Sequence, residues 1–200
     1  TIGMMLGLVT PSAGEILIDN KNINLFKRDE VLNKFNFASP YVELPKKLTV
    51  KQNLEIYGRL YGLKNLDKKI DEISVDLDIK NFFNRKTGEL SSGQKNRVSL
   101  AKSLINKPEI LLLDEPTASL DPDIGDFIRS YIQDYKVKNK VTILLASHNM
   151  SEVERLCDSV IMMRQGSIID KGTCKDLIQK HGRGNLEETF LKLARSKNEF

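Results

Sequence analysis

The sequence predicts an α/β domain built on a parallel sheet. Two short apolar runs, Ile110–Leu113 and Val141–Leu145, have the composition of strands that are buried on both faces of such a sheet. Between them, residues 123–137 carry apolar side chains at helical spacing, which predicts the crossover helix between two parallel strands. Because strands and helices alternate in this way, we expect helices layered on the sheet.

The first 48 residues predict shorter elements. Apolar residues within 2–9 are spaced as on one face of a helix, and residues 16–18 predict a strand that ends in the Asp19-Asn20 turn. Residues 27–35 predict another short helix. Residues 36–47 contain two prolines and have no clear period, so we expect a strand followed by a loop.

Residues 49–104 predict a helical insert, because no strand pattern occurs in them. Thr49 is a suitable N-cap for a helix that ends at Gly62, and residues 67–78 and 91–106 predict further helices. We therefore describe one domain in three parts: the beginning of the core, the insert, and the rest of the core, with boundaries at 1–48, 49–104 and 105–200.

The last part of the chain predicts a helix over residues 151–157 and a β-hairpin. The hairpin strands are expected at 160–163 and 167–170, on either side of Gly166. His181 stands close to two glycines, which favours an exposed loop position.

Composition excludes several classes of protein. The 200 residues are 40% hydrophobic and 29% charged, which argues against disorder. No apolar stretch approaches the roughly 20 residues that a membrane span needs. The 31 basic and 27 acidic residues give a net charge of +4, too mild and too dispersed to indicate a nucleic-acid partner. Two cysteines are too few for a disulfide framework or a zinc cluster.

Polar residues follow both predicted sheet strands. Asp114-Glu115 follows the first strand and Ser147-His148 the second, and parallel sheets bind ligands beyond the carboxyl ends of their strands. Adjacent carboxylates suit metal-assisted hydrolysis, since one can hold a divalent cation and the other can activate water. An Asp-Glu pair can equally begin a loop before a helix, and a lone histidine can be structural.

The helix over residues 91–106 begins with small residues. Ser91, Ser92 and Gly93 would expose backbone amides at the positive end of the helix dipole, which is a suitable place for an anion. A plain N-cap is the alternative interpretation. The Lys95-Asn96-Arg97 stretch is expected on the exposed face of this helix.

These segments together resemble the ATP-binding cassette (ABC) ATPases. In order and spacing, Leu90–Gln94, Pro108–Thr117, Ser119–Asp121 and Ser147-His148 resemble that family's signature motif, Walker B strand, D-loop and switch histidine. The resemblance covers essentially the whole chain. It implies a P-loop NTPase fold with a RecA-like parallel-sheet core, a helical subdomain that carries the signature motif, and a small hairpin near the C-terminus.

The resemblance also implies a site for ATP and Mg²⁺. Asp114 would serve the magnesium ion, Glu115 would polarise the attacking water, and His148 would contact the γ-phosphate. Asp121 would couple two sites across a dimer of cassettes. The residues that would face a nucleotide held by the second cassette subunit are Ser91, Ser92, Gly93 and Gln94.

Two departures from the family pattern bear on these expectations. The phosphate-binding pattern G-x-x-x-x-G-K-[ST] does not occur, and Thr1-Ile2 is similar to the continuation of the helix that it opens. We therefore expect that the chain begins just after this loop and that these residues alone bind ATP poorly and are inactive. Pro40 occupies the position where the family usually has a glutamine, so either Ser39 or a water substitutes for it, or coupling is altered.

Subfamily features are similar to those of exporter-type cassettes for polysaccharides, drugs or lipids, although generic helical packing also explains them. They lie in four segments: Leu48–Leu54, Tyr61–Leu63, Ala146–Glu154 and Asn185–Phe190. The resemblance implies a second cassette, identical or related, and separate transmembrane permease subunits that hold the protein at the cytoplasmic face of the cell membrane. The alternatives are a non-transport cassette, in translation or DNA repair, and a regulatory cassette with weak turnover.

Overall fold

The computed structural model describes residues 1–23 and 33–195. It divides into two compact units, residues 1–146 and 147–200, and each unit is described by itself. The helix expected over residues 27–35 falls largely outside the described residues. Phe35 was expected in that helix, and it is instead the first residue of a strand.

A three-stranded parallel sheet forms the centre of the first unit, as the sequence predicts. Its strands are β3 (Phe35–Ala38), β4 (Ile110–Asp114) and β5 (Thr142–Ala146), in the order β3-β4-β5. Strand β4 lies between the other two, and its leucines are buried. Strand β5 pairs only with β4 within the described residues and is only half-buried, which differs from the burial on both faces that its sequence predicts.

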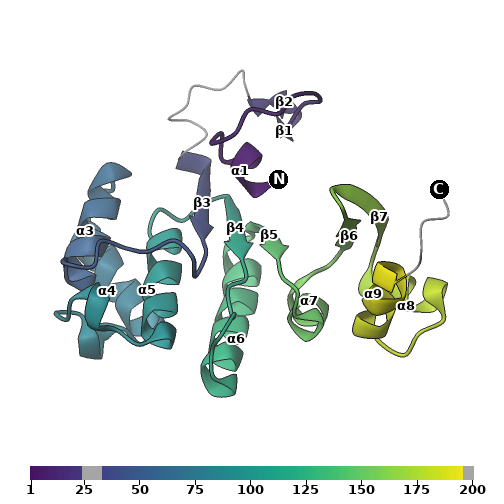
Figure 1. The fold of residues 1–200 in the computed structure, drawn as a ribbon. Coiled ribbons are helices and arrows are strands. Elements are labelled where there is room, and N and C mark those ends of the chain that lie inside the picture. Colours follow the sequence, from purple (N-terminus) through teal and green to yellow (C-terminus); the bar gives the residue numbers. More distant parts are fainter. Residues whose placement is uncertain (24–32, 196–200) are drawn as a thin grey trace. The chain divides into compact units, whose positions relative to one another are not determined.

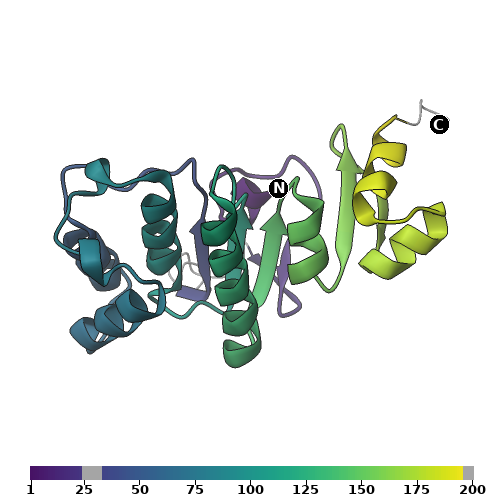
Figure 2. The same ribbon diagram turned by 90° about the horizontal axis from the view of Figure 1, so that it is seen from below.

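Helices lie on both faces of this sheet (Figures 1 and 2). Helix α6 (Pro122–Asn139) is the predicted crossover between β4 and β5, and it covers one face. On the other face, α1 (Ile2–Met5) packs against an apolar cluster around Ile18, Phe35 and Leu112. The crossover that was predicted from helical spacing therefore closes the core on one side.

The predicted strand and turn near the N-terminus form a small hairpin. Strands β1 (Leu17–Ile18) and β2 (Lys21–Asn22) pair antiparallel. Asp19 and Asn20 form the turn with φ values of 51° and 62°. Asp and Asn adopt this left-handed conformation more readily than most residues, so the Asp-Asn pair explains the two-residue turn.

The helical insert contains α3 (Val50–Leu60), α4 (Leu66–Asp76) and α5 (Ser92–Leu104), joined through single turns η2 (Lys80–Phe82) and η3 (Thr87–Glu89). Thr49 caps α3 as predicted: the Gln52 amide donates to Thr49 Oγ1 at 3.2 Å, and the Thr49 amide donates to Gln52 Oε1 at 2.9 Å. Gly62 follows α3 with φ 63°, where glycine carries no steric cost.

The second unit contains α7 (Met150–Leu156), β6 (Val160–Arg164), β7 (Ser167–Gly172), α8 (Cys174–His181) and α9 (Leu186–Arg195). The hairpin of β6 and β7 was predicted, whereas α8 and α9 were not. The expectation of a loop at His181 is wrong, because this residue ends α8 and its Nε2 lies 2.6 Å from Asp170 Oδ2. Within the described ranges, no helix has the length and apolarity needed to cross a bilayer.

Candidate functional site

The carboxylate of Asp114 lies at the carboxyl end of the central strand. Three buried leucines precede it in β4, and the register places Asp114 beside Ala146 at the end of β5. Because the apolar part of the strand is fixed in the core, the half-buried Asp114 has a defined position at this edge of the sheet. This edge is where ligands bind in open parallel sheets.

Ser39 orients the Asp114 side chain. The Ser39 hydroxyl donates a hydrogen bond to Asp114 Oδ2 at 3.3 Å, and it accepts one from the amide of Tyr41 at 3.3 Å. Ser39 is buried, whereas its neighbour Pro40 is exposed. Of the substitutes considered for the missing glutamine, the Ser39 hydroxyl is therefore the one that contacts Asp114 in this structure.

The backbone of Glu115 adopts an uncommon conformation. Its φ is 51°, in the left-handed region that costs a non-glycine residue about 1 kcal/mol. The Glu115 amide donates to the carbonyl of Ala146 at 2.8 Å, and its carbonyl accepts from the amide of Ala118 at 3.0 Å. These bonds fix the change in backbone direction directly after β4. The Cα atom of the half-buried Glu115 therefore has a defined position beside Asp114.

The N-terminus of α5 shows the predicted cap. The Gln94 amide donates to Ser91 Oγ at 3.3 Å, and the Ser91 amide donates to Gln94 Oε1 at 3.1 Å. The Gln94 side chain therefore closes the cap of its own helix. Ser91 and Ser92 are exposed, whereas Gly93 is buried. The helix thus presents its first two small residues to solvent while the third packs inside.

Gly93 allows α5 and α6 to approach each other. A Cβ atom on Gly93 would lie 2.6 Å from the Cδ1 atom of Ile124, so a larger residue would force Ile124 to move. Asp121 is exposed and is the N-cap residue of α6, and its side chain makes no capping hydrogen bond. Because both residues lie at the junction of α5 and α6, the predicted signature and D-loop positions belong to one region of the first unit.

Asn96 is a residue of this region that the sequence interpretation missed. It was expected on the exposed face of α5, but it is buried, and its Nδ2 donates to the carbonyl of Pro116 at 2.6 Å. Arg97 is not on an exposed face either: it pairs with Asp78 at 2.8 Å and lies over the ring of Phe82. Asn96 therefore ties the helix to the segment that follows Glu115.

A cavity of about 370 Å³ opens beside these elements in the first unit. It is bounded by the segment after β3, by the first turns of α5, and by residues 118–120. Ser39 and Ser92 both line it. At its rim, a hydrogen bond from Lys46 lowers the pKa of the Glu43 carboxyl, and the two charges are 2.7 Å apart. The cavity connects the residue that contacts Asp114 with the tip of α5.

His148 lies in the second unit, and it is exposed. It follows Ser147, whose hydroxyl donates to Glu152 Oε2 at 2.7 Å and accepts from the amide of Asn149 at 3.1 Å. These bonds fix the backbone on both sides of His148 at the start of α7. The structure therefore brings Asp114, Glu115 and the tip of α5 together in one unit, while the placement of His148 beside them stays a prediction.

The donor set at Asp114 fits a hard divalent cation. Mg²⁺ is held in proteins by one or two carboxylates together with substrate phosphates and water, and does not need a cage of protein ligands. Asp114 supplies a carboxylate and Ser39 a neighbouring hydroxyl oxygen. Within the described residues, no group of three or more acidic, histidine or cysteine side chains is arranged to hold a metal ion.

Comparisons with known proteins show which proteins this chain is similar to. A family model described as "ABC transporter" matches residues 1–118. The ABC transporter ATP-binding protein NatA of Bacillus subtilis is 35% identical over 191 residues, covering 94% of this chain and 77% of that protein. The methionine import ATP-binding protein MetN 1 of Bacillus cereus is 34% identical over 178 residues, covering 85% of this chain and 51% of that protein.

Solved structures show the same fold. The structure of cbiO1 from Clostridium perfringens, described as part of the ABC transporter complex cbiONQ, is 29% identical with a TM-score of 0.78. The match covers 90% of this chain and 73% of that one. The shared architecture supports the P-loop NTPase fold that the sequence predicts.

Proposed function

Because this chain belongs to the ABC transporter family as an ATP-binding protein, we propose that it hydrolyses ATP at the end of β4 and so powers transport. One observation carries the proposal. Asp114 and Glu115 stand side by side at the carboxyl end of the buried central strand, the first bonded to Ser39 and the second held by a left-handed backbone.

The two carboxylates have different roles in the proposed reaction. Asp114 would hold Mg²⁺, which when bound neutralises charge on the transferred phosphate. Glu115 would accept a hydrogen bond from the attacking water and take its proton as the water oxygen bonds to the γ-phosphorus and the bond from that phosphorus to the leaving ADP oxygen breaks. His148 would donate a hydrogen bond to the γ-phosphate. In phosphoryl transfer most of the rate comes from such positioning and charge stabilisation.

A second cassette subunit completes the proposed site. Ser91 and Ser92 are exposed at the positive end of α5, where the amides can bind the phosphates of a nucleotide held by another chain. Asp121, which is also exposed, would relay the occupancy of one site to the other. A triphosphate shared in this way favours the closed dimer, and hydrolysis removes the contacts that hold it closed.

We propose that the 370 Å³ cavity receives a cytoplasmic segment of a transmembrane permease subunit. Tyr41 and Val42 line it and remain 73% and 52% exposed, which leaves apolar surface for a partner. Substitution of Tyr41→Ala is expected to abolish co-purification with the permease while the ATPase rate of the free subunit is unchanged. Co-purification at the wild-type level would reject this docking site.

Attachment to a permease would place the protein at the inner face of the cell membrane. We propose that the transporter is an exporter, on the resemblance of the segments in α3 and around His148 to exporter-type cassettes. The test is transport in inverted membrane vesicles, where an exporter accumulates its cargo on addition of ATP. Uptake into right-side-out vesicles that depends on an external binding protein would instead identify an importer.

A regulatory cassette with weak turnover is the alternative that one observation favours, because Pro40 cannot supply the side-chain oxygen of the usual glutamine. The turnover number of the complete protein distinguishes the two. Residues 1–200 contain no G-x-x-x-x-G-K-[ST] pattern, so we propose that this part of the protein binds ATP weakly by itself.

The decisive variant is Glu115→Gln, which keeps the size of the side chain and removes the base. We expect kcat for ATP hydrolysis to fall by about 10²–10⁴-fold with little change in ATP binding. Glu109→Gln is the matched control, because Glu109 is an exposed carboxylate just before the same strand and pairs with Lys34 at 2.9 Å. A Glu115→Gln protein that hydrolyses ATP at the wild-type rate would show that the assigned base is wrong.

A further inference from the structure

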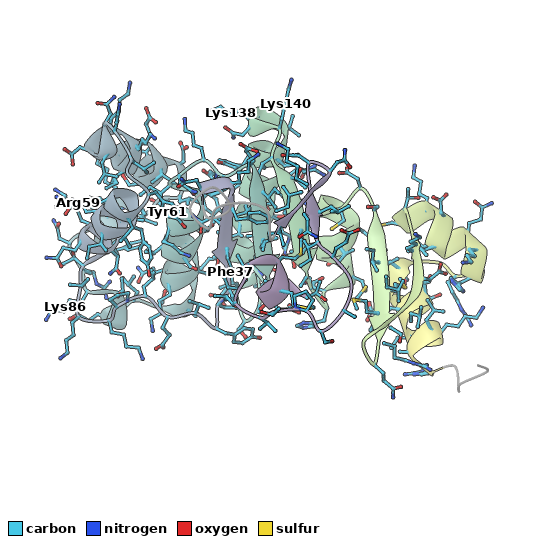
Figure 3. All side chains as sticks on the ribbon, turned by 90° about the horizontal axis from the view of Figure 1, so that it is seen from above. Phe37, Arg59, Tyr61, Lys86, Lys138 and Lys140 are labelled. Carbon is cyan, nitrogen blue, oxygen red and sulfur yellow. The ribbon has the colours of Figure 1, made fainter. Side chains whose placement is uncertain are left out.

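Lys102 joins helix α5 to strand β3 by two hydrogen bonds that run in opposite directions. Its Nζ donates to the backbone carbonyl of Phe37 at 2.8 Å, and its own carbonyl accepts from Asn36 Nδ2 at 3.4 Å. Asn36 also donates to Asn106 Oδ1 at 2.8 Å, just beyond the end of α5. The last part of β3, where Figure 3 labels Phe37, is therefore attached to α5 through polar contacts as well as apolar packing.

The same ammonium group reaches a third element. Lys102 Nζ lies 5.5 Å from the centroid of the Tyr57 ring in α3, within the range of a cation–π interaction. Tyr61, which directly follows α3 and is labelled in Figure 3, is half-buried, and this burial raises the pKa of its hydroxyl. One positive charge on α5 thus contacts β3 and α3 together.

Stability alone does not explain this charge. Burial lowers the pKa of Lys102 to about 8, because water is excluded from the ammonium group. Within residues 1–23 and 33–195, no carboxylate is recorded as an ion-pair partner of Lys102. The titratable side chain that contacts it is Tyr57, while β3 presents the neutral Phe37 carbonyl and Asn36. A half-buried ammonium group that has a neutral carbonyl and an aromatic ring as partners, and no carboxylate among the described residues, contributes less to folding than an ion pair would, which points to a functional role.

The direction of the pH effect follows from the lowered pKa. Below about pH 8 the folded protein carries the charge, and the desolvation penalty is present. Between this pH and the ordinary lysine pKa near 10.4, the folded state releases the proton before the unfolded state does, so folding becomes more favourable as pH rises. Over the same interval the bond to the Phe37 carbonyl loses its charge assistance and weakens. As pH rises through this interval, the free energy of unfolding therefore increases while the hydrogen bond from Lys102 to Phe37 weakens.

Two residues after Phe37, Ser39 bonds to the Asp114 carboxylate. We propose that Lys102 is a positioning residue: its ammonium group fixes the end of β3 to the helical insert and thereby holds Ser39 against Asp114. This inference rests on the proposed ATPase function. It predicts that movement of the insert is transmitted through Lys102 to the carboxylate that serves the magnesium ion.

The test compares Lys102→Met, which keeps the length of the side chain but has no donor, with Lys102→Arg, which keeps a donor that stays charged above pH 12. Lys64→Met, in the exposed turn after α3, removes one lysine charge without touching β3 and is the matched control. Each complete protein is examined by amide hydrogen exchange of the peptide that covers residues 35–42, by magnesium titration of ATPase activity, and by the pH dependence of kcat.

For Lys102→Met we expect at least tenfold faster exchange in residues 35–42 and a higher half-saturating magnesium concentration, with neither change in Lys64→Met. Wild-type kcat should fall as pH rises through about 8, and Lys102→Arg should restore exchange protection and lack this alkaline decrease. Unchanged exchange in Lys102→Met, or an identical alkaline decrease in Lys102→Arg, would overturn the proposal. If no protein hydrolyses ATP, the proposed function fails, while the exchange comparison still decides the role of Lys102.

Discussion

Single hydrogen bonds set the positions of the side chains that carry the proposed chemistry. The Ser39 hydroxyl orients Asp114, and two backbone bonds hold Glu115 in a left-handed conformation at the end of β4. A carboxylate with a fixed oxygen can serve a cation without reorganisation, and a fixed base can align a water molecule. The proposed activity thus depends on a few hydrogen bonds of about 3 Å, and substitution of a single residue can remove each side-chain bond separately.

Removal of the Ser39 hydroxyl tests whether it orients Asp114 for magnesium binding. We expect Ser39→Ala to raise the half-saturating magnesium concentration about 10–100-fold, because loss of a hydrogen bond to a metal-binding carboxylate weakens metal affinity by this amount. Pro40→Gln in the Ser39→Ala background returns a side-chain oxygen to the position where the family has a glutamine, and should recover part of the affinity. Magnesium titrations of ATPase activity give both values. An unchanged titration for Ser39→Ala would contradict the role of this hydroxyl.

The contact of Asp170 with α8 gives a pH-dependent prediction in the second unit. Hydrogen bonds from Lys180 and His181 hold the pKa of the Asp170 carboxyl at about 2. A lowered carboxyl pKa stabilises the fold above the ordinary pKa near 3.9, and this stabilisation is lost as pH falls toward 2. Asp170→Asn should therefore reduce the free energy of unfolding by about 2 kcal/mol at pH 7. The difference should shrink below pH 4.

Urea unfolding of wild type and Asp170→Asn at pH 7 and pH 3 measures that difference. Asp176→Asn is not a neutral control, because Asp176 completes the cap of α8 with Thr173. Glu187→Gln, in the first turn of α9, is the more suitable comparison for a loss of one exposed charge in the same unit. A difference that is the same at both pH values would contradict the assignment to Asp170.

Helix ends are the elements on which the site and the insert depend. Helices α3 and α5 begin with the same capping box, Thr49 with Gln52 and Ser91 with Gln94. We assign a purely structural role to the cap of α3, whereas we propose that the exposed amides after the cap of α5 also bind phosphate. The plain-cap interpretation and the anion-site interpretation of α5 are therefore compatible, because the side chains close the cap and leave the dipole end exposed.

Substitution at the two caps separates these roles. Thr49→Ala and Ser91→Ala should each lower the free energy of unfolding by about 1 kcal/mol, since each removes one capping acceptor. Only Ser91→Ala should also weaken ATP-dependent association with the second subunit. Thr49→Ser, which keeps the acceptor, should behave as wild type. Urea unfolding and sedimentation in Mg-ATP give both quantities, and equal loss of association in both alanine variants would show that the cap of α5 acts through stability alone.

Local patterns in the sequence were sufficient to predict most elements, whereas contacts between elements were not. Thr49, Gly62 and the Asp19-Asn20 turn act through neighbouring backbone, so composition and spacing identify them. Asn96 is buried because its amide bonds to Pro116, 20 residues away, which no local pattern shows. The Ser39–Asp114 bond joins residues 75 positions apart, and the sequence interpretation did not predict it.

Helix α8 shows a local signal that was overlooked. His181 was assigned to a loop because of its neighbouring glycines, yet Thr173 and Asp176 form a capping box and Gly182 ends the helix with φ 59°. The glycine beside His181 thus marks a helix C-terminus. The division of the domain at 48/49 and 104/105 and the assigned site residues stay predictions, to be tested by the variants above.

For the whole molecule, the residues assigned to the proposed site come from both units. Asp114, Glu115 and the tip of α5 belong to residues 1–146, and His148 belongs to residues 147–200. We predict that the tip of α5 from one cassette subunit reaches the phosphates of ATP held by the other only when the two subunits associate. ATP hydrolysis and dimer formation then depend on the same bound triphosphate. The nucleotide that is hydrolysed also provides the contacts that hold the two subunits together.

Sedimentation velocity of the complete Glu115→Gln protein tests this claim most directly. With hydrolysis blocked, Mg-ATP should convert the protein to a dimer, while Mg-ADP should leave it monomeric, and His148→Ala or Ser92→Glu in the same background should prevent the conversion. A Glu115→Gln protein that binds ATP and remains monomeric at every protein concentration would contradict the account.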